Sequence, residues 1–310
     1  MTRATTAPAT DSAADRSPGA PDPVYKDPAS AQRADPDYAL ILAYDGTDFA
    51  GYARQSDPPQ RTVQDEVERA LATALRLPTE SLAAVVAGRT DAGVHAAGQV
   101  VSFAAGALAQ PGPLGSSQNA ALLRSLNALT PADISVRDLR ATPAGFSARF
   151  DAIAREYRYY IAATSSPPLF SRRYAWQVAG FASDPARRER LRRGAAALIG
   201  EHDFSSFAVA ASLEGKNPVR TILSIDFADT RCFGEPLVEI RVVGTAFLHS
   251  MVRVIVGTLV ALDAGRIAPG AVPGILEART RAAAGPTAPA RGLTLYGVTY
   301  PVFSSAPLSS

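Results

Sequence analysis

The residues best suited to chemistry gather in one glycine-punctuated segment, which reads GRTDAGVHAAGQVVSF from Gly88 to Phe103. Its carboxylate is Asp91, with Arg89 two residues before it and His95 four residues after it. Largely apolar runs flank the segment, so we expect a loop between two strands, where a rigid scaffold usually presents functional side chains. These residues could support chemistry that needs one carboxylate beside a cation. The structural alternative is that Asp91 caps a turn and Arg89 forms a plain salt bridge.

Two further segments carry candidate residues. In SARFDAIAREYRYYI, from 147 to 161, alternation places Tyr157 and Tyr159 on one face of a strand, and core packing is their alternative role. In GTAFLHSMVRVIVG, from 244 to 257, apolar side chains surround Arg253 in nearly every helical direction. A buried arginine needs a partner, unless it reaches the surface along its own stem.

Other reaction classes lack their motifs in this chain. There is no GxxxxGK[ST] or GxGxxG run to hold nucleotide phosphates. The histidines His95, His202 and His249 stand far apart, without the spacing of metal ligands. We therefore expect no metal site and no cofactor.

The run GRTDAGVHAAGQV resembles the active-site signature of the tRNA pseudouridine synthase A family, GRTDxGVHxxGQV. The other two segments resemble that family's SARxxxxxRxYxYxI and FLHxMVRxIVG patterns, and smaller matches extend the resemblance over about residues 38–301. Two positions depart from the pattern. Tyr52 replaces a tryptophan, and Ser250 stands where some members carry a second histidine, a difference that puts only a peripheral RNA contact in doubt.

The resemblance implies a role for each candidate. Asp91 would initiate the reaction, either as a nucleophile at the ribose C1′ or as a base at the ribose. Arg253 would form a salt bridge with Asp91 that keeps the carboxylate ionised and oriented. Tyr157 would stack against the flipped uracil. Arg89 would fill the vacated position or hold the flipped phosphate, and His95 would bind substrate.

The family isomerises uridine to pseudouridine at positions 38, 39 and 40 of the tRNA anticodon arm, without a cofactor and as a homodimer whose RNA crosses both subunits. The first alternative is a catalytically inactive RNA-binding or chaperone protein on the same fold. The second is an aspartate-dependent hydrolase, which lacks the paired acid that glycosidic hydrolysis usually employs.

Strand and helix signals interleave without strict βαβ regularity, which predicts an α+β protein. The resemblance implies the pseudouridine synthase fold, with two sheet-and-helix halves around a central cleft. We expect a disordered tail over 1–36, an N-terminal half with the catalytic loop over 37–142, a C-terminal half over 143–302 and a frayed tail over 303–310. Predicted strands span 38–44, 134–139, 155–162, 221–227, 238–242 and 293–300, and predicted helices span 62–77, 185–199 and 247–262, with another helix after a loop over 106–119.

Composition indicates an ordinary globular chain: 310 residues, 47% hydrophobic, with a formal net charge of +2. It contains no run of eighteen apolar residues, so we expect no membrane span. A single cysteine, Cys232, fits a reducing compartment, and we expect a cytoplasmic protein. Five arginines between 187 and 193 make the predicted helix there a candidate RNA contact, although a solvated face is the favoured reading.

Overall fold

The computed structural model describes residues 37–55, 58–79, 82, 84–104, 116–215, 217–268 and 270–307. The tail expected over 1–36 and most of the loop expected over 106–119 lie outside the described residues. The predicted α+β class is confirmed, since one mixed sheet and five α-helices make up the described chain.

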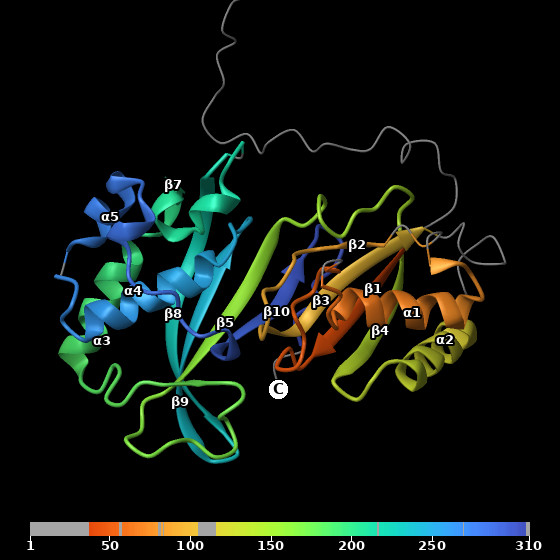
Figure 1. Ribbon diagram of the computed structural model, residues 1–310, viewed down its shortest axis with the longest axis horizontal. Coiled ribbons are helices and arrows are strands. Elements are labelled where there is room, and N and C mark those ends of the chain that lie inside the picture. Colours follow the sequence, from red (N-terminus) through yellow and green to blue (C-terminus); the bar gives the residue numbers. More distant parts are fainter. Residues whose placement is uncertain are drawn as a thin grey trace, which may run out of the picture.

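Ten strands form a single sheet that runs through both lobes of the molecule (Figure 1). Eight of them lie in the order β4 (Ile134–Thr142), β1 (Asp37–Tyr44), β3 (His95–Ala104), β10 (Leu293–Thr299), β5 (Ala154–Ala162), β9 (Glu235–Gly244), β8 (Val219–Cys232) and β7 (Gly200–Asp203). Two short strands complete it, β2 (Val85–Val86) beside β3 and β6 (Trp176–Gln177) beside β5.

The last strand, β10, joins the two halves of the chain. It pairs in parallel with β3 and antiparallel with β5, so that Leu295 lies between Ala96 and Tyr157. The loop that carries Asp91 immediately precedes β3. Segments more than 60 residues apart in the chain are therefore brought to the middle of one sheet, and the hydrogen-bonded register holds them there.

Helices cover the sheet in two groups (Figure 1). In the N-terminal half, α1 (Val63–Leu75) packs on α2 (Ser116–Leu129), which contacts β4. Thr62 is the N-cap of α1, because its side chain accepts a hydrogen bond from the backbone N–H of Asp65. In the other half lie α3 (Pro185–Ala196), α4 (Met251–Asp263) and α5 (Val272–Ala278).

Two of the five arginines of α3 serve the fold. Arg187 pairs with Asp263 at the end of α4 at 2.7 Å, and Arg188 pairs with Asp229 of β8 at 2.8 Å. These contacts fasten the helix to its neighbours, so Arg187 and Arg188 do not simply form the solvated face that was favoured, and fewer arginines of the helix are left for RNA.

The helix predicted from Phe247 begins later than expected, at Met251. Ser250 adopts a left-handed backbone with φ of 59°, which a helix cannot continue through. Phe247, Leu248 and His249 therefore belong to the segment that leads into α4. The helix α2 shifts in the opposite direction and begins early, at Ser116, inside the stretch expected to be a loop.

No helix in the described part of the chain is long and apolar enough to cross a membrane. Several large apolar side chains are nonetheless exposed at one tip of the molecule. There the ring of Phe233, in the turn between β8 and β9, lies 5.7 Å from the ring of Phe170.

Candidate active site

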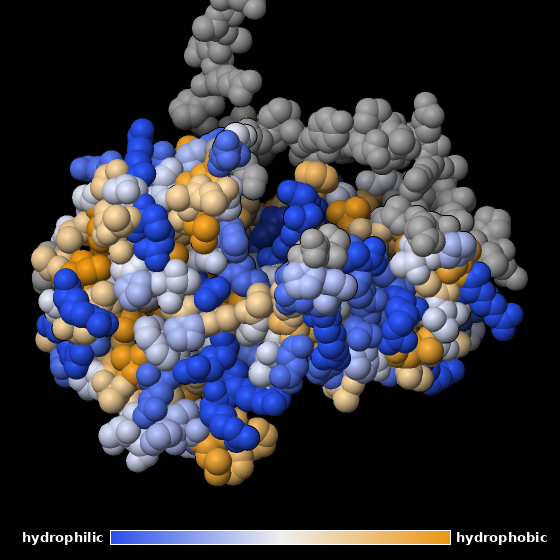
Figure 2. All heavy atoms as spheres, viewed as in Figure 1, coloured by the Kyte–Doolittle hydropathy of each residue, from blue (hydrophilic) through white to orange (hydrophobic). Residues whose placement is uncertain are grey.

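A pocket of about 890 Å³ lies where the loop before β3, the strand β5 and the segment before α4 meet. In Figure 2, hydrophilic side chains gather in the hollow between the two lobes. Asp91, Arg89 and Tyr157 all line this pocket, together with Phe247 and His249. The three segments singled out by their residues thus contribute to one site.

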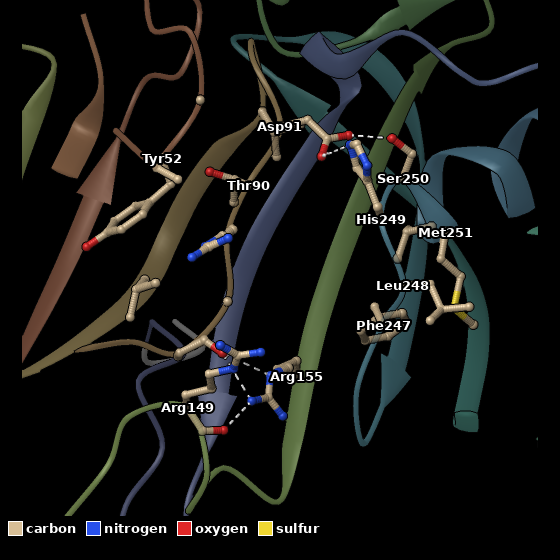
Figure 3. Close-up of a pocket in the computed structure, with 18 of the residues that line it drawn as sticks. Tyr52, Thr90, Asp91, Arg149, Arg155, Phe247, Leu248, His249, Ser250 and Met251 are labelled. Atoms are coloured by element: carbon tan, nitrogen blue, oxygen red, sulfur yellow. Dashed lines mark hydrogen bonds and ion pairs between the residues drawn. The ribbon is translucent and has the colours of Figure 1, made fainter. Parts of the chain in front are cut away.

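The carboxylate of Asp91 is held by the first turn of α4 (Figure 3). Its Oδ2 accepts hydrogen bonds from Ser250 Oγ and from Arg253 Nη1, each at 2.7 Å. Its Oδ1 lies 3.3 Å from His249 Nε2. The predicted Arg253–Asp91 salt bridge is confirmed, and Arg253 does not reach for the surface: its Nε donates to the carbonyl of Ala288 at 2.8 Å.

This arrangement divides the two carboxylate oxygens between two tasks. Oδ2 is fixed by a hydroxyl and a guanidinium, and both come from residues at the N-terminus of a helix, whose dipole favours an anion. The partner of Oδ1 is the more exposed one, because the side chain of His249 is 53% exposed. Oδ1 is therefore the carboxylate oxygen with fewer fixed partners.

A hydrogen-bond network beneath the loop keeps Asp91 in place. The hydroxyls of Tyr44 and Thr90 lie 2.8 Å apart, and the amide of Gln99 donates to the carbonyl of Gly88 at 2.8 Å. Burial raises the pKa of Tyr44 to about 12, so its hydroxyl remains protonated in this network. The backbone N–H of Tyr52 donates to the carbonyl of Thr90 at 3.0 Å. The loop is thus preorganised by both of its flanks.

Tyr157 presents a buried, neutral ring at the wall of the pocket. Its relative exposure is 8%, and its ring meets Phe247 edge to face, with centroids 5.1 Å apart. Burial raises the pKa of Tyr157 well above its ordinary value, so the side chain is a phenol and not a phenolate at neutral pH. It is therefore suited to contact a flat apolar ring rather than to remove a proton.

Comparisons with known proteins agree with these segments. A family profile described as tRNA pseudouridine synthase matches residues 195–301. The tRNA pseudouridine synthase A of Bacillus subtilis (strain 168) is 42% identical over 259 residues, which cover 84% of this chain and 97% of that protein. The protein of the same name from Neisseria gonorrhoeae (strain NCCP11945) is 42% identical over 89% of this chain and 94% of its own length.

The chain belongs to the tRNA pseudouridine synthase A family. The expected pseudouridine synthase fold is thereby confirmed as well. The two sheet-and-helix halves share one continuous sheet, and the pocket lies between them. Among the described residues, no group of three or more His, Cys, Asp or Glu side chains could hold a metal ion.

Arg89 lies at the pocket, two residues before Asp91. The side chain is exposed, it lines the pocket, and it forms no ion pair with any residue in the described ranges. The plain salt bridge that was its alternative role is absent there. Arg89 is therefore a cation held two residues from the carboxylate and available to a substrate.

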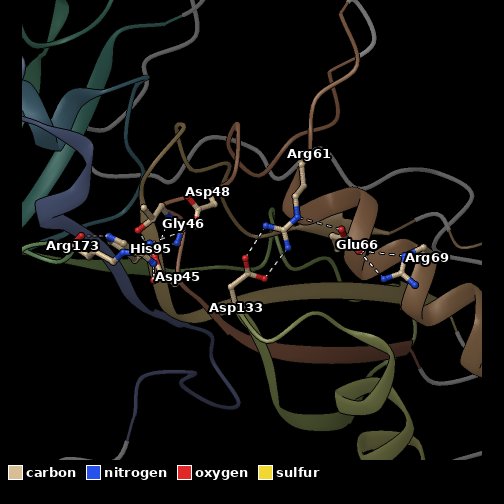
Figure 4. Close-up of polar contacts among 10 residues, drawn as sticks. Asp45, Gly46, Asp48, Arg61, Glu66, Arg69, His95, Asp133 and Arg173 are labelled. Carbon is tan, nitrogen blue, oxygen red and sulfur yellow. Dashed lines mark hydrogen bonds and ion pairs between the residues drawn. The ribbon is translucent and has the colours of Figure 1, made fainter.

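The structure does not bring His95 into the pocket of this pseudouridine synthase A homologue. The ring is 3% exposed; its Nδ1 accepts from the backbone N–H of Gly46 at 3.1 Å, and its Nε2 lies 3.1 Å from the carbonyls of Arg173 and Arg291 (Figure 4). Burial lowers the pKa of His95, against the opposing charge of Asp45, so the neutral ring is favoured. His95 joins the start of β3 to two distant segments, and a direct substrate contact is not part of our proposal.

Ser250 and His249 are the site residues that sequence reasoning did not assign. Ser250 was expected to affect a peripheral contact, and it instead donates directly to the carboxylate of Asp91. The signal was present in its position, three residues before Arg253, which is the spacing of an N-cap and the third residue of a helix. His249 reaches Asp91 because the helix begins after it.

Removing the Ser250 hydroxyl is expected to lower kcat about tenfold, since Oδ2 loses one of its two hydrogen bonds while Arg253 remains. Ser250→Ala and Ser250→Gly should lose the same activity. Their free energies of unfolding should differ, because glycine adopts the left-handed backbone without strain. Steady-state kinetics and thermal unfolding of both variants measure the two effects separately. An unchanged kcat in both variants would contradict the role given to the hydroxyl.

Proposed function

We propose that this protein isomerises uridine to pseudouridine at positions 38, 39 and 40 of the tRNA anticodon arm, without a cofactor. The observation that carries the proposal is the position of the Asp91 carboxylate. Its Oδ2 accepts hydrogen bonds from Ser250 and Arg253, and the carboxylate lines a pocket that the neutral ring of Tyr157 also lines. The relatives described above bear the name of that activity.

The isomerisation requires an ionised carboxylate and no added reactant. The N1–C1′ bond of the nucleotide breaks, the uracil turns, a C5–C1′ bond forms, and the proton lost from C5 is balanced by one gained at N1. No atom is added or removed. Asp91 initiates the sequence through Oδ1, either by attacking C1′ or by taking a proton from the ribose, and both roles require a carboxylate rather than a carboxylic acid.

The target uridine must first leave its base stack, which costs a few kcal/mol. The buried ring of Tyr157 offers the flipped uracil a flat apolar partner, and a stacked base contributes about 1–3 kcal/mol. Arg89 is positioned at the pocket to fill the space that the base leaves or to hold its phosphate. Together these contacts offset the cost of flipping.

The remaining RNA contacts are expected to recognise A-form shape and phosphates. We further propose a homodimer, in which the tRNA crosses both subunits, and a cytoplasmic location. The free thiol of Cys232, the chain's one cysteine, fits a reducing compartment. Light scattering coupled to size exclusion measures the mass of the assembly directly.

The proposal is tested with anticodon stem-loop RNA that carries tritium at C5 of its uridines. Tritium release, together with mapping of the modified positions, should locate pseudouridine at 38, 39 and 40. The same RNA with its uridines moved outside these positions is the matched control and should release no tritium. If the correct RNA binds but no pseudouridine forms, the inactive RNA-binding alternative replaces the proposal.

A further inference from the structure

Arg155 is a half-buried cation that the reaction described above does not use. It lies on β5 two residues before Tyr157, and its side chain lines the same pocket. Burial lowers its pKa from the ordinary arginine value, and the positive charge of Arg149 adds to that effect. A charge in such a place has a cost unless something compensates it.

Backbone carbonyls take up all five N–H groups of this guanidinium. Nε and Nη2 donate to Ala87 at 3.4 and 3.1 Å, Nη2 also donates to Arg149 at 2.7 Å, and Nη1 donates to Thr245 at 2.6 Å and to Ala152 at 3.4 Å. Arg155 thus ties together the strand end before the catalytic loop, the turn around residue 150 and the segment that leads to α4. All its N–H groups therefore have acceptors, but these acceptors are neutral carbonyls that do not balance its positive charge.

No carboxylate in the described ranges forms an ion pair with Arg155 or with Arg149. Arg149 is exposed at the pocket, with its guanidinium 5.3 Å from the ring centroid of Phe150. Its side-chain nitrogens donate no hydrogen bond to any residue in the described ranges. Two like charges therefore share one wall of the pocket. Such a pair lowers the energy of an anion bound against it, and the exposed guanidinium of Arg149 has its fork available for one.

The two arginines stand at the end of the pocket away from Asp91. In Figure 3, Thr90 lies between Asp91 at one end and Arg149 and Arg155 at the other. In an RNA strand the phosphates lie on the outer surface of the strand, away from the bases. An RNA strand whose target ribose lies at Asp91 can place a neighbouring phosphate against Arg149 and Arg155, because all three residues line one pocket.

We propose that Arg149, backed by Arg155, binds a phosphodiester of the RNA strand next to the nucleotide that reaches Asp91. The inference rests on the proposed function for the identity of the ligand. Arg149 makes the direct contact through its free donors. Arg155 acts through its charge and by holding the backbone of Arg149 in place, because its own donors are already occupied.

The test measures RNA binding by the full chain carrying Asp91→Asn, so that no turnover is needed. Anticodon stem-loop RNAs with a single neutral methylphosphonate, placed in turn at each linkage around the target, serve as probes. Arg149→Gln should weaken binding of unmodified RNA about tenfold, and reduce the slope of log K against log salt by about 0.7–0.9. Arg149→Lys should restore part of the affinity, since lysine supplies charge without the fork.

The decisive result is non-additivity. One methylphosphonate should weaken binding by the Arg149-containing chain and have little further effect in Arg149→Gln. The matched control is Arg266→Gln, an exposed arginine beyond the far end of α4, in which the methylphosphonate effect should persist. An unchanged salt slope in Arg149→Gln, or additive effects at every linkage, would overturn the proposal.

This outcome is separable from the proposed function. If the wild-type chain makes no pseudouridine but the methylphosphonate effect still depends on Arg149, the subsite stands and the isomerase activity does not. If pseudouridine forms and the cycle is additive, the isomerase stands and the subsite is rejected.

Discussion

Replacing Asp91 by asparagine is expected to lower pseudouridine formation by at least about 10⁴-fold, while the affinity for anticodon-arm RNA stays within a few-fold of wild type. Asparagine keeps the shape of the side chain and an oxygen that can accept from Ser250. It lacks the charge that either attack at C1′ or proton removal from the ribose requires. Tritium release measures the turnover, and filter binding or fluorescence anisotropy measures the affinity.

Asp226→Asn is the matched control for that experiment. Asp226 is an exposed aspartate of β8, and its ion pair with Arg241, at 3.5 Å, lies outside the pocket. Its replacement changes the same chemical group and should leave turnover unchanged. Residual activity of Asp91→Asn within tenfold of wild type would remove Asp91 from the centre of the mechanism.

Arg253→Gln is expected to lower kcat about 100-fold and to destabilise the protein by about 1–3 kcal/mol. Arg253 and Asp91 are each about one-fifth exposed, so the carboxylate loses a partner that water replaces only in part. The change also removes the hydrogen bond from Nε to Ala288, which holds the segment before β10 against α4. Steady-state kinetics and urea unfolding measure the two losses separately.

A double-mutant cycle separates orientation of the carboxylate from general damage. If Arg253 acts through Asp91, the combined Asp91→Asn and Arg253→Gln variant should be scarcely less active than Asp91→Asn alone. Arg253→Lys should recover part of the stability, but not full activity, because one ammonium cannot serve both Asp91 and Ala288 in the same geometry. Additive losses would indicate that Arg253 acts independently of Asp91.

The elements that position the site were predictable where the local pattern was strong. The alternation along β5 predicted its buried face, and the structure buries Tyr157, Tyr159 and Ile161 there. The apolar run that contains Arg253 predicted a helix and a need for a partner. Its beginning was wrong by four residues, because the left-handed backbone of Ser250 leaves no mark in hydropathy.

Residue type alone was a weaker guide to role. His95 is four residues from Asp91, and the family resemblance implied that it binds substrate. The register of β3 directs its ring toward Gly46 and two carbonyls, and the ring is buried there. Ser250 looked peripheral and contacts the carboxylate. Local sequence does not encode which way a side chain points once neighbouring segments pack against it.

The motifs were enough to recognise the family and the carboxylate, because each motif depends on residue types at short spacing. The pairing of Asp91 with Arg253, 162 residues away, followed from the family resemblance. Three features came only from the fold. They are the different partners of Oδ1 and Oδ2 of Asp91, the position of His249, and the backbone carbonyls that accept from Arg155. Each of these features joins groups that are dozens to more than a hundred residues apart, through β10 and the first turn of α4. Such contacts depend on strand register and on where a helix begins, and these are settled by the packing of the whole chain rather than by any one segment.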